Sequence, residues 1–369
     1  MRLWTFLLFS CGIISTLVAA PQAVTEQSAH FQITSFAGKA EAEKKAQFLE
    51  DLVSQYSQVL QIPSAPVKVS VDLFPTVKAY EASVLPLIGK TPSPPLALKF
   101  SDKKTLLLGV AQPDDDSAWA FQTFLSWFWL AAPKAPAWLE EGLARYFWDI
   151  SGKSPSWQFG QNRIFADELL KLWETQPSLT FLTKTTLTNA EKLSAWGLVT
   201  FLMNTPNPTY ARAFGAYLAN LTSANPTPLA TVLTPEMLTQ LSHDCWTWWK
   251  AHPGRTTLLQ EAEKALKAGE GETAGPLLAQ ALQIEKDGNT LYLAGLAAYE
   301  KKVYPEAEEY YLQAQKTWKD APPGLLDYAI GLVLYQQQKW SLAKQHFESA
   351  GKASEAYNKL TAPLLANLP

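Results

Sequence analysis

Alternating apolar and polar residues predict a small sheet in the first third of the chain. Residues 30–36 and 67–73 alternate with the period of two that is typical of a half-buried strand. Residues 96–110 alternate on both sides of a Ser-Asp-Lys turn, which predicts a β-hairpin. Apolar residues at helical spacing predict helices over residues 40–60 and from about 76 to 83. Helices alone follow this β-α-β-α-β-β order, so we expect an α+β fold that is mostly α.

The second third of the chain contains an uncharged segment that predicts a buried helix. Residues 117–133 carry no charge and are apolar on all sides, yet they are too few to span a bilayer. Further helices are predicted over residues 165–173, 190–203, 210–221 and 235–249. We therefore expect a lobe with a small mixed sheet, followed by a helical second lobe.

Small residues recur at fixed spacing in the last third of the chain. Gly295, Ala307, Tyr311 and Ala314 return 36 residues later as Gly331, Ala343, Phe347 and Ala350, and a weaker copy stands 33 residues earlier as Ala262, Ala274, Leu278 and Ala281. Small side chains let two antiparallel helices approach closely, and the large aromatic residue fills the space that remains. The pattern resembles the tetratricopeptide repeat, whose period is about 34 residues. The resemblance implies an α-solenoid over residues 256–369, with three repeats and a capping tail.

Four tyrosines fall on first-helix positions, which line a concave groove in the tetratricopeptide family: Tyr292, Tyr299, Tyr328 and Tyr335. One interpretation is a tyrosine-faced groove that binds a peptide. The other is that these rings pack between neighbouring helices, and the sequence leaves both open. Repeat arrays commonly act as interaction surfaces, so we expect a protein or peptide partner at this groove.

The first 20 residues have the pattern of a signal peptide. Arg2 is the only charged residue there, and the apolar run over residues 3–20 ends in Leu-Val-Ala-Ala, a small-residue cleavage site. The alternative is an uncleaved membrane anchor, because the run is nearly long enough to span a bilayer. Cys11 and Cys245 are the only cysteines, so cleavage leaves no internal disulfide. We expect an exported protein, periplasmic or extracellular, that meets a membrane only if this segment is retained.

Composition excludes two broad classes of protein. Apolar residues make up 47% and aromatic residues 12% of the 369 residues, which excludes global disorder. The formal net charge is −3 and there is no block of Lys and Arg, so we expect no nucleic-acid partner.

One segment carries the most specific resemblance to an enzyme family. Residues 136–147 read Pro-Ala-Trp-Leu-Glu-Glu-Gly-Leu-Ala-Arg-Tyr-Phe, which resembles the P-x-W-L-x-E-G-L-A-x-Y segment of gluzincin metallopeptidases of the peptidase MA-like group. Residues 196–202, Trp-Gly-Leu-Val-Thr-Phe-Leu, resemble a later helix of that family. The resemblance implies a gluzincin-like α/β lobe over residues 28–150 and a helical lobe over residues 151–253.

The resembled family also needs a zinc-binding motif that this chain lacks. The motif H-E-x-x-H places two His ligands on one helical face, with a Glu between them that activates the bound water. At the family's approximate spacing before Glu141 this chain reads Ala120, Phe121, Gln122, Thr123 and Phe124. Glu141 matches the family's third zinc ligand, but no His occurs between His30 and His243. We therefore expect no metal, no cofactor and no catalytic residue, with Phe121 and Phe124 filling the former cleft and Glu141 in an ion pair or at a helix start.

These observations favour an exported, catalytically degenerate peptidase-like scaffold that binds a protein or peptide through its repeats. One alternative is a glycan or cell-wall binder that uses exposed tryptophans, which crowd one stretch at Trp119, Trp127, Trp129, Trp138, Trp148 and Trp157. Another is an active hydrolase with a site that the motifs do not reveal.

Overall fold

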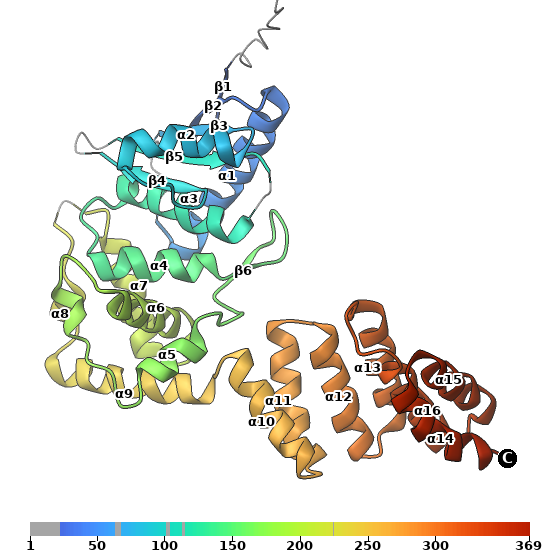
Figure 1. Cartoon of the computed structure of the whole chain (residues 1–369). Coiled ribbons are helices and arrows are strands. Elements are labelled where there is room, and N and C mark those ends of the chain that lie inside the picture. The colour runs from blue at the N-terminus through green and yellow to red at the C-terminus, as the bar shows by residue number, and fades with distance from the viewer. Residues whose placement is uncertain (1–22, 63–67, 101–103, 113–114, 224) are drawn as a thin grey trace, which may run out of the picture. The chain divides into compact units, whose positions relative to one another are not determined.

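The structure is a computed structural model that describes residues 23–62, 68–100, 104–112, 115–223 and 225–369 (Figure 1). Its fold is α+β and mostly α, with a small mixed sheet, as the sequence predicts. The predicted signal peptide over residues 1–20 lies outside the described residues. Among the described residues, no helix has both the length and the apolar character needed to cross a bilayer.

The chain divides into two compact units. The first comprises residues 1–51 and 66–114, and the second comprises residues 52–65 and 115–369. The helix α1 (Lys39–Leu60) contributes its beginning to the first unit and its end to the second.

The first unit contains a five-stranded sheet whose strand order is β1-β2-β3-β5-β4. Its strands are β1 (Val24–Gln27), β2 (Phe31–Ser35), β3 (Val69–Phe74), β4 (Leu96–Lys99) and β5 (Thr105–Val110). The three central strands are parallel, and β1 and β4 pair antiparallel at the two edges. The strand β1 is not predicted from the sequence, because it is short, has one apolar residue and is held by backbone pairing to β2.

The helix α2 (Val77–Ile88) is longer than the sequence indicates. It begins at Thr76, whose side chain accepts a hydrogen bond from the Ala79 amide, and ends at Gly89 in the left-handed conformation. Pro86 lies in the last turn of the helix, which continues to Ile88.

The second unit begins with helices that pack through aromatic and small side chains. They are α3 (Asp116–Ala131), α4 (Ala137–Trp148), α5 (Ala166–Leu172), α6 (Asn189–Asn204), α7 (Pro208–Asn220), α8 (Leu229–Val232) and α9 (Pro235–Ala251), with a small hairpin of β6 (Ile150–Ser151) and β7 (Gln158–Phe159). Gly142 of α4 lies so close to α6 that a Cβ there would be 2.6 Å from Val199 and 2.8 Å from the Ala195 carbonyl oxygen. This contact joins α4 to the helices that follow, so the division falls near residue 114 and not at the expected lobe boundary of 150.

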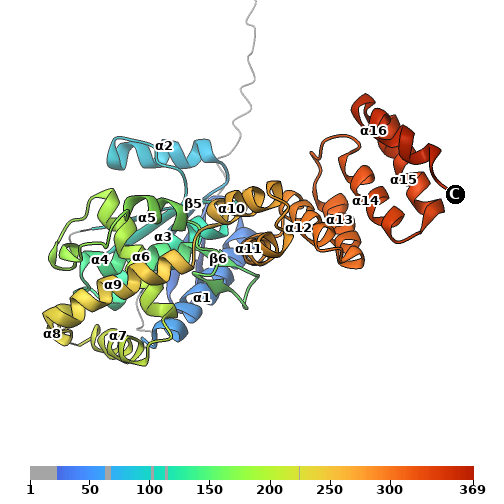
Figure 2. The same cartoon turned by 90° about the horizontal axis from the view of Figure 1, so that it is seen from below.

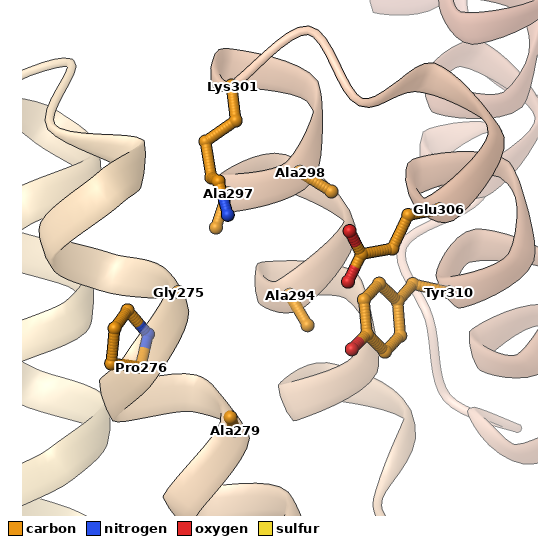
Figure 3. Close-up of a pocket in the computed structure, with 9 residues that line it drawn as sticks. All are labelled: Gly275, Pro276, Ala279, Ala294, Ala297, Ala298, Lys301, Glu306 and Tyr310. Carbon is orange, nitrogen blue, oxygen red and sulfur yellow. The ribbon is translucent and has the colours of Figure 1, made fainter.

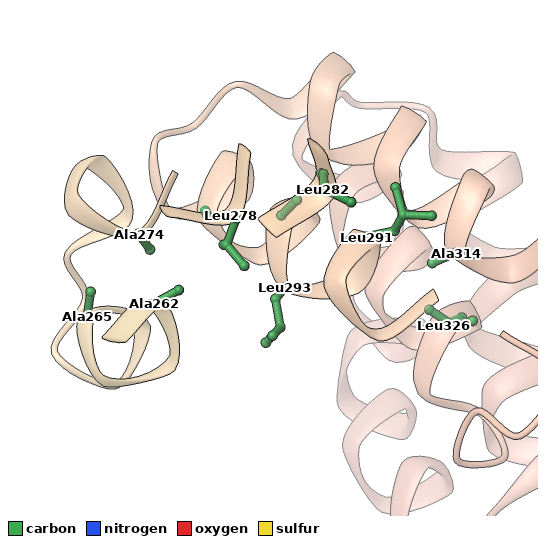
Figure 4. Close-up of a cluster of buried hydrophobic side chains, with 11 residues drawn as sticks. Ala262, Ala265, Ala274, Leu278, Leu282, Leu291, Leu293, Ala314 and Leu326 are labelled. Carbon is green, nitrogen blue, oxygen red and sulfur yellow. The ribbon is translucent and has the colours of Figure 1, made fainter. Parts of the chain in front are cut away.

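The rest of the second unit is a run of paired helices, as predicted from the repeated small residues (Figure 2). They are α10 (Arg255–Lys267), α11 (Gly271–Ile284), α12 (Gly288–Glu300), α13 (Tyr304–Thr317), α14 (Leu325–Gln336), α15 (Trp340–Ala353) and α16 (Glu355–Ala366). Figure 4 shows the first part of their core, where Ala262 and Ala265 of α10 face Ala274 of α11. We call α10 to α16 the repeat module.

In two of the pairs, α12–α13 and α14–α15, a glycine of the first helix lies against an aromatic ring of the second. A Cβ on Gly295 would be 2.4 Å from Cε1 of Tyr311, and a Cβ on Gly331 would be 2.6 Å from Cδ1 of Phe347. Both rings are almost fully buried. The predicted combination of small residue and aromatic filler is confirmed in both repeats.

The start of the repeat module is fixed by a carboxylate from α5. Asp167 accepts hydrogen bonds from the amides of Thr256 (3.0 Å) and Thr257 (3.3 Å), which are free donors in the first turn of α10. A Cβ on Gly254 would stand 2.5 Å from this carboxylate. Glycine is therefore required at this position, directly before α10.

The Gly295–Tyr311 contact gives a stability prediction. Gly295→Ala is expected to lower the free energy of unfolding by about 1–3 kcal/mol, because the added methyl group overpacks a closed interface. Gly215→Ala in α7 is the control, since its Cβ would meet no atom within 4 Å. That control should gain about 0.5–1 kcal/mol from helix propensity. Urea unfolding followed by circular dichroism measures both, and equal stability of the two variants would contradict the packing argument.

Candidate functional site

The positions that correspond to the missing zinc motif lie in the core of the second unit. Ala120 and Phe124 on α3 are fully buried. The Phe124 ring packs 4.8 Å from the Phe128 ring and 4.9 Å from the Phe147 ring, measured between centroids. The Tyr56 hydroxyl donates a hydrogen bond of 2.7 Å to the Ala120 carbonyl oxygen. Ala120 and Phe124 therefore lie in packed core.

Phe121 differs from Phe124 in its surroundings. It is half-buried and packs edge-on against Trp148 of α4, with 5.1 Å between the ring centroids. Trp148 in turn packs edge-on against Phe165, which precedes α5. Phe121 thus belongs to an aromatic layer at the border of the core and is less enclosed than the sequence analysis expects.

Glu141 forms the ion pair that the sequence analysis expects. Its Oε1 lies 2.5 Å from Nζ of Lys192 on α6, and its Oε2 lies 4.0 Å from Nε of Arg145 on the same helix. The side chains of Glu141 and Lys192 are 22% and 31% exposed, so water reaches the pair. Among the described residues, no group of three or more His, Cys, Asp and Glu side chains is arranged to hold a metal ion.

The crowded tryptophans are mostly structural. Trp119, Trp127, Trp138 and Trp157 are buried, which removes four of the six from any surface that stacks on a sugar. Trp129 and Trp148 are half-buried. The alternative of a glycan surface built from this stretch therefore loses most of its residues.

The four predicted groove tyrosines share one arrangement. Each is half-buried and rests on an aromatic ring of a later helix: Tyr292 on Tyr311 at 5.7 Å, Tyr299 on Tyr304 at 5.7 Å, Tyr328 on Tyr357 at 5.3 Å and Tyr335 on Trp340 at 5.1 Å. One part of each ring supports the helix packing while another part remains exposed. The structure shows that these rings pack against neighbouring helices, and peptide binding at their exposed parts stays a prediction.

Two leucines complete the pattern. Leu296 lies between Tyr292 and Tyr299 on α12, and Leu332 lies between Tyr328 and Tyr335 on α14, and both are half-buried. Residues spaced by four and then three share one side of a helix. We call these six residues the tyrosine face. The sequence analysis missed the leucines, although the same helical spacing that selects the tyrosines selects them too.

Two phenol groups of this face, those of Tyr292 and Tyr299, are held neutral by their surroundings. Burial raises the pKa of Tyr292 and that of Tyr299 above the ordinary value. Gln336 donates a hydrogen bond of 3.4 Å to the Tyr299 hydroxyl, which keeps its own O–H available as a donor. The tyrosine face thus combines apolar ring surface with uncharged groups that donate and accept hydrogen bonds.

A small pocket lies on the other side of α12 (Figure 3). It has a volume of about 230 Å³ and a base formed by Ala294, Ala297 and Ala298, with Glu306 and Tyr310 of α13 at its side. At 100° per residue, these alanines point roughly opposite to the tyrosine face. The repeat module therefore has two different sides, and Tyr310 provides a tyrosine away from the tyrosine face.

Comparison with known proteins adds no relative. No protein-family model matches the chain, and neither the curated proteins nor the solved structures include a match. Any assignment of function therefore rests on the residues described above.

Substitutions at Phe124 and at Glu141 should differ in their effect on the free energy of unfolding. Phe124→Ala should lower the free energy of unfolding by about 3–5 kcal/mol, because it leaves a cavity in an aromatic core. Glu141→Gln should change it by at most about 1 kcal/mol, because solvent screens the pair with Lys192. Denaturant unfolding measures both effects. Elemental analysis of the purified protein should find no stoichiometric zinc, and zinc that is retained by the wild type but lost in Glu141→Gln would contradict this interpretation.

Proposed function

We propose that this chain is an exported, catalytically degenerate peptidase-like scaffold that binds a protein or peptide partner through its repeat module. The observation that carries the proposal is the tyrosine face. Consecutive first helices, α12 and α14, each present Tyr-Leu-Tyr at the same spacing on one side. Tyrosine is among the residues enriched at the energetic centres of protein interfaces.

The chemistry of the tyrosine face favours an extended peptide as its occupant. The rings are already held by intramolecular packing, so binding costs them little side-chain entropy. Apolar side chains of a peptide would lie on the exposed ring surface, and its backbone amides and carbonyls would pair with the phenol hydroxyls. The repeat arrangement supplies the length, because the two consecutive pairs α12–α13 and α14–α15 each contribute one Tyr-Leu-Tyr set.

The packing of the core around α3 supports the part of the proposal that the chain is not catalytic. A charged metal and its hydroxide need ligands and space, and here Phe124 occupies the space with an apolar ring. Glu141 already has a cationic partner in Lys192. An active hydrolase remains the alternative, and a digest of a broad peptide library with and without a chelator tests it.

Peptide binding is tested with a displayed library of random peptides selected on the full mature chain. Enriched peptides are synthesised and their Kd is measured by fluorescence anisotropy. Tyr299→Ala and Tyr335→Ala should each weaken binding by about 30-fold, the effect of losing a central interface residue. Leu332→Lys should weaken it similarly, since it places a charge in the middle of the tyrosine face.

Tyr310→Ala is the matched control, because it removes the same side chain from the other side of the module. Its Kd should equal that of the wild type. The proposal is wrong if no peptide is enriched, or if the enriched peptides bind the three face variants and the control equally.

A further inference from the structure

A pocket of about 330 Å³ lies in the helical part of the second unit, and none of its lining residues belongs to the repeat module. The lining residues come from the loop before α4, from α4, from the short 3₁₀ helix η1 (Thr180–Thr183), from α7 and from residues 226–229, which lead into α8. The volume is within the range of about 300–1,000 Å³ that is typical of small-molecule sites.

The walls of this pocket are mostly apolar and are held in place. Leucine and proline side chains supply most of the apolar lining: Leu182, Leu229, Pro136, Pro226 and Pro228. The proline rings restrict the backbone around the pocket. The Thr227 amide donates a hydrogen bond of 2.9 Å to Oδ1 of Asn220, which fixes the residues before α8. A pocket whose walls are fixed before the ligand arrives binds it at a low cost in entropy.

Two buried polar side chains open into this pocket without a partner. Trp138 is 1% exposed and Tyr217 is 3% exposed, and both line the pocket. Among the described residues, neither Nε1 of Trp138 nor the Tyr217 hydroxyl has a hydrogen-bond partner. Both atoms keep accessible surface, unlike fully enclosed unpartnered atoms such as Nε1 of Trp196. Because buried polar groups normally have partners, these two indicate a ligand that accepts hydrogen bonds in the pocket.

Both groups are available as donors at neutral pH. An indole N–H can only donate a hydrogen bond. Burial raises the pKa of Tyr217, so its hydroxyl keeps its proton. The two rings are nearly parallel, with 6.0 Å between their centroids and 13° between their planes. The two donors therefore belong to one wall of the pocket.

The charge at the pocket is positive. Of the described residues that line it, Lys134 is the one with a charged side chain, and none is acidic. The other polar lining residues, Thr183 and Thr227, have hydroxyl groups, which can also donate. Hydrogen bonds to an ionised acceptor are stronger than those to a neutral one. A carboxylate fits this set, because it offers two oxygens to the two donors and a single negative charge to one ammonium group.

We propose that this pocket binds a small carboxylic acid whose carboxylate accepts hydrogen bonds from Nε1 of Trp138 and the Tyr217 hydroxyl. The apolar part of the ligand lies against the leucine and proline side chains. An apolar cavity of about 150 Å³ takes one benzene molecule, so a pocket of about 330 Å³ has room for one aromatic ring and a short chain that ends in the carboxylate. The site is independent of the peptide-binding proposal, because none of its residues belongs to the tyrosine face.

Isothermal titration calorimetry of the mature chain tests the proposal with three probes of one shape. They are 3-phenylpropanoate, its neutral amide 3-phenylpropanamide, and the cation 3-phenylpropylamine. The acid should bind, and the amide should bind about 10-fold more weakly, because its hydrogen bonds lack the charge of the acceptor. The amine should bind more weakly still, because it repels Lys134 and cannot accept from either donor.

Tyr217→Phe should weaken binding of the acid by about 10-fold or more, since it removes one donor to a charged group and keeps the ring. Its urea midpoint should not fall, because the lost hydroxyl has no partner within the protein. Tyr210→Phe is the matched control on the same helix, since the Tyr210 hydroxyl donates a hydrogen bond of 2.8 Å to Asp244 and does not line the pocket. That control should leave the Kd unchanged although it lowers the urea midpoint.

Lys134→Gln at the exposed end of the pocket gives a second readout. It should weaken binding of the acid by about 2–5-fold, the effect of one solvated charge, and leave binding of the amide unchanged. The proposal is overturned if the acid does not bind at millimolar concentration or binds no more tightly than the amide or the amine. It is also overturned if Tyr217→Phe binds as the wild type does, or if Lys134→Gln affects the acid and the amide equally. Tyr299→Ala should bind the acid normally, so the failure of one proposal does not imply the failure of the other.

Discussion

The last two helical pairs of the repeat module, α12–α13 and α14–α15, depend on the close contact between a glycine of the first helix and an aromatic ring of the second. Because Gly295 and Gly331 have no side chain, Tyr311 and Phe347 can lie flat against the first helix and fill the interface. That contact fixes which side of α12 and α14 is buried. The Tyr-Leu-Tyr sets on those helices lie beside the buried side. They are half-buried, and aromatic rings of later helices support the tyrosines. The tyrosine face is thus a product of the packing beneath it.

Aromatic packing of the same kind surrounds Phe124 in the helices before the repeats. Aromatic rings from α1, α3 and α4 meet around Phe124, and small residues such as Gly142 let α4 approach α6. A segment that resembles a zinc ligand helix therefore serves as a packing element, with Glu141 paired to Lys192. Asp167 then links these helices to the start of α10. The helices before the repeats and the repeat module thus belong to one compact unit.

Much of the fold follows from local patterns, whereas the candidate sites depend on long-range contacts. The strands of the mixed sheet alternate regularly, α3 carries no charge after Asp116, and the Gly295–Tyr311 spacing implies helix pairing. The strand β1 escaped prediction because its partner β2 and not its own sequence holds it in the sheet. Leu296 and Leu332 of the tyrosine face also escaped prediction, because a leucine at helical spacing gives no signal that separates a half-buried surface from the core.

Hydrogen–deuterium exchange with a selected peptide measures most directly whether the tyrosine face is the binding surface. On adding the peptide, backbone amides of α12 and α14 should exchange more slowly, while those of α13 and α15 change less, because the peptide lies on the first helices. Protection confined to α13 and α15, or to residues 115–253, would contradict the account, as would the absence of any change in the repeat module.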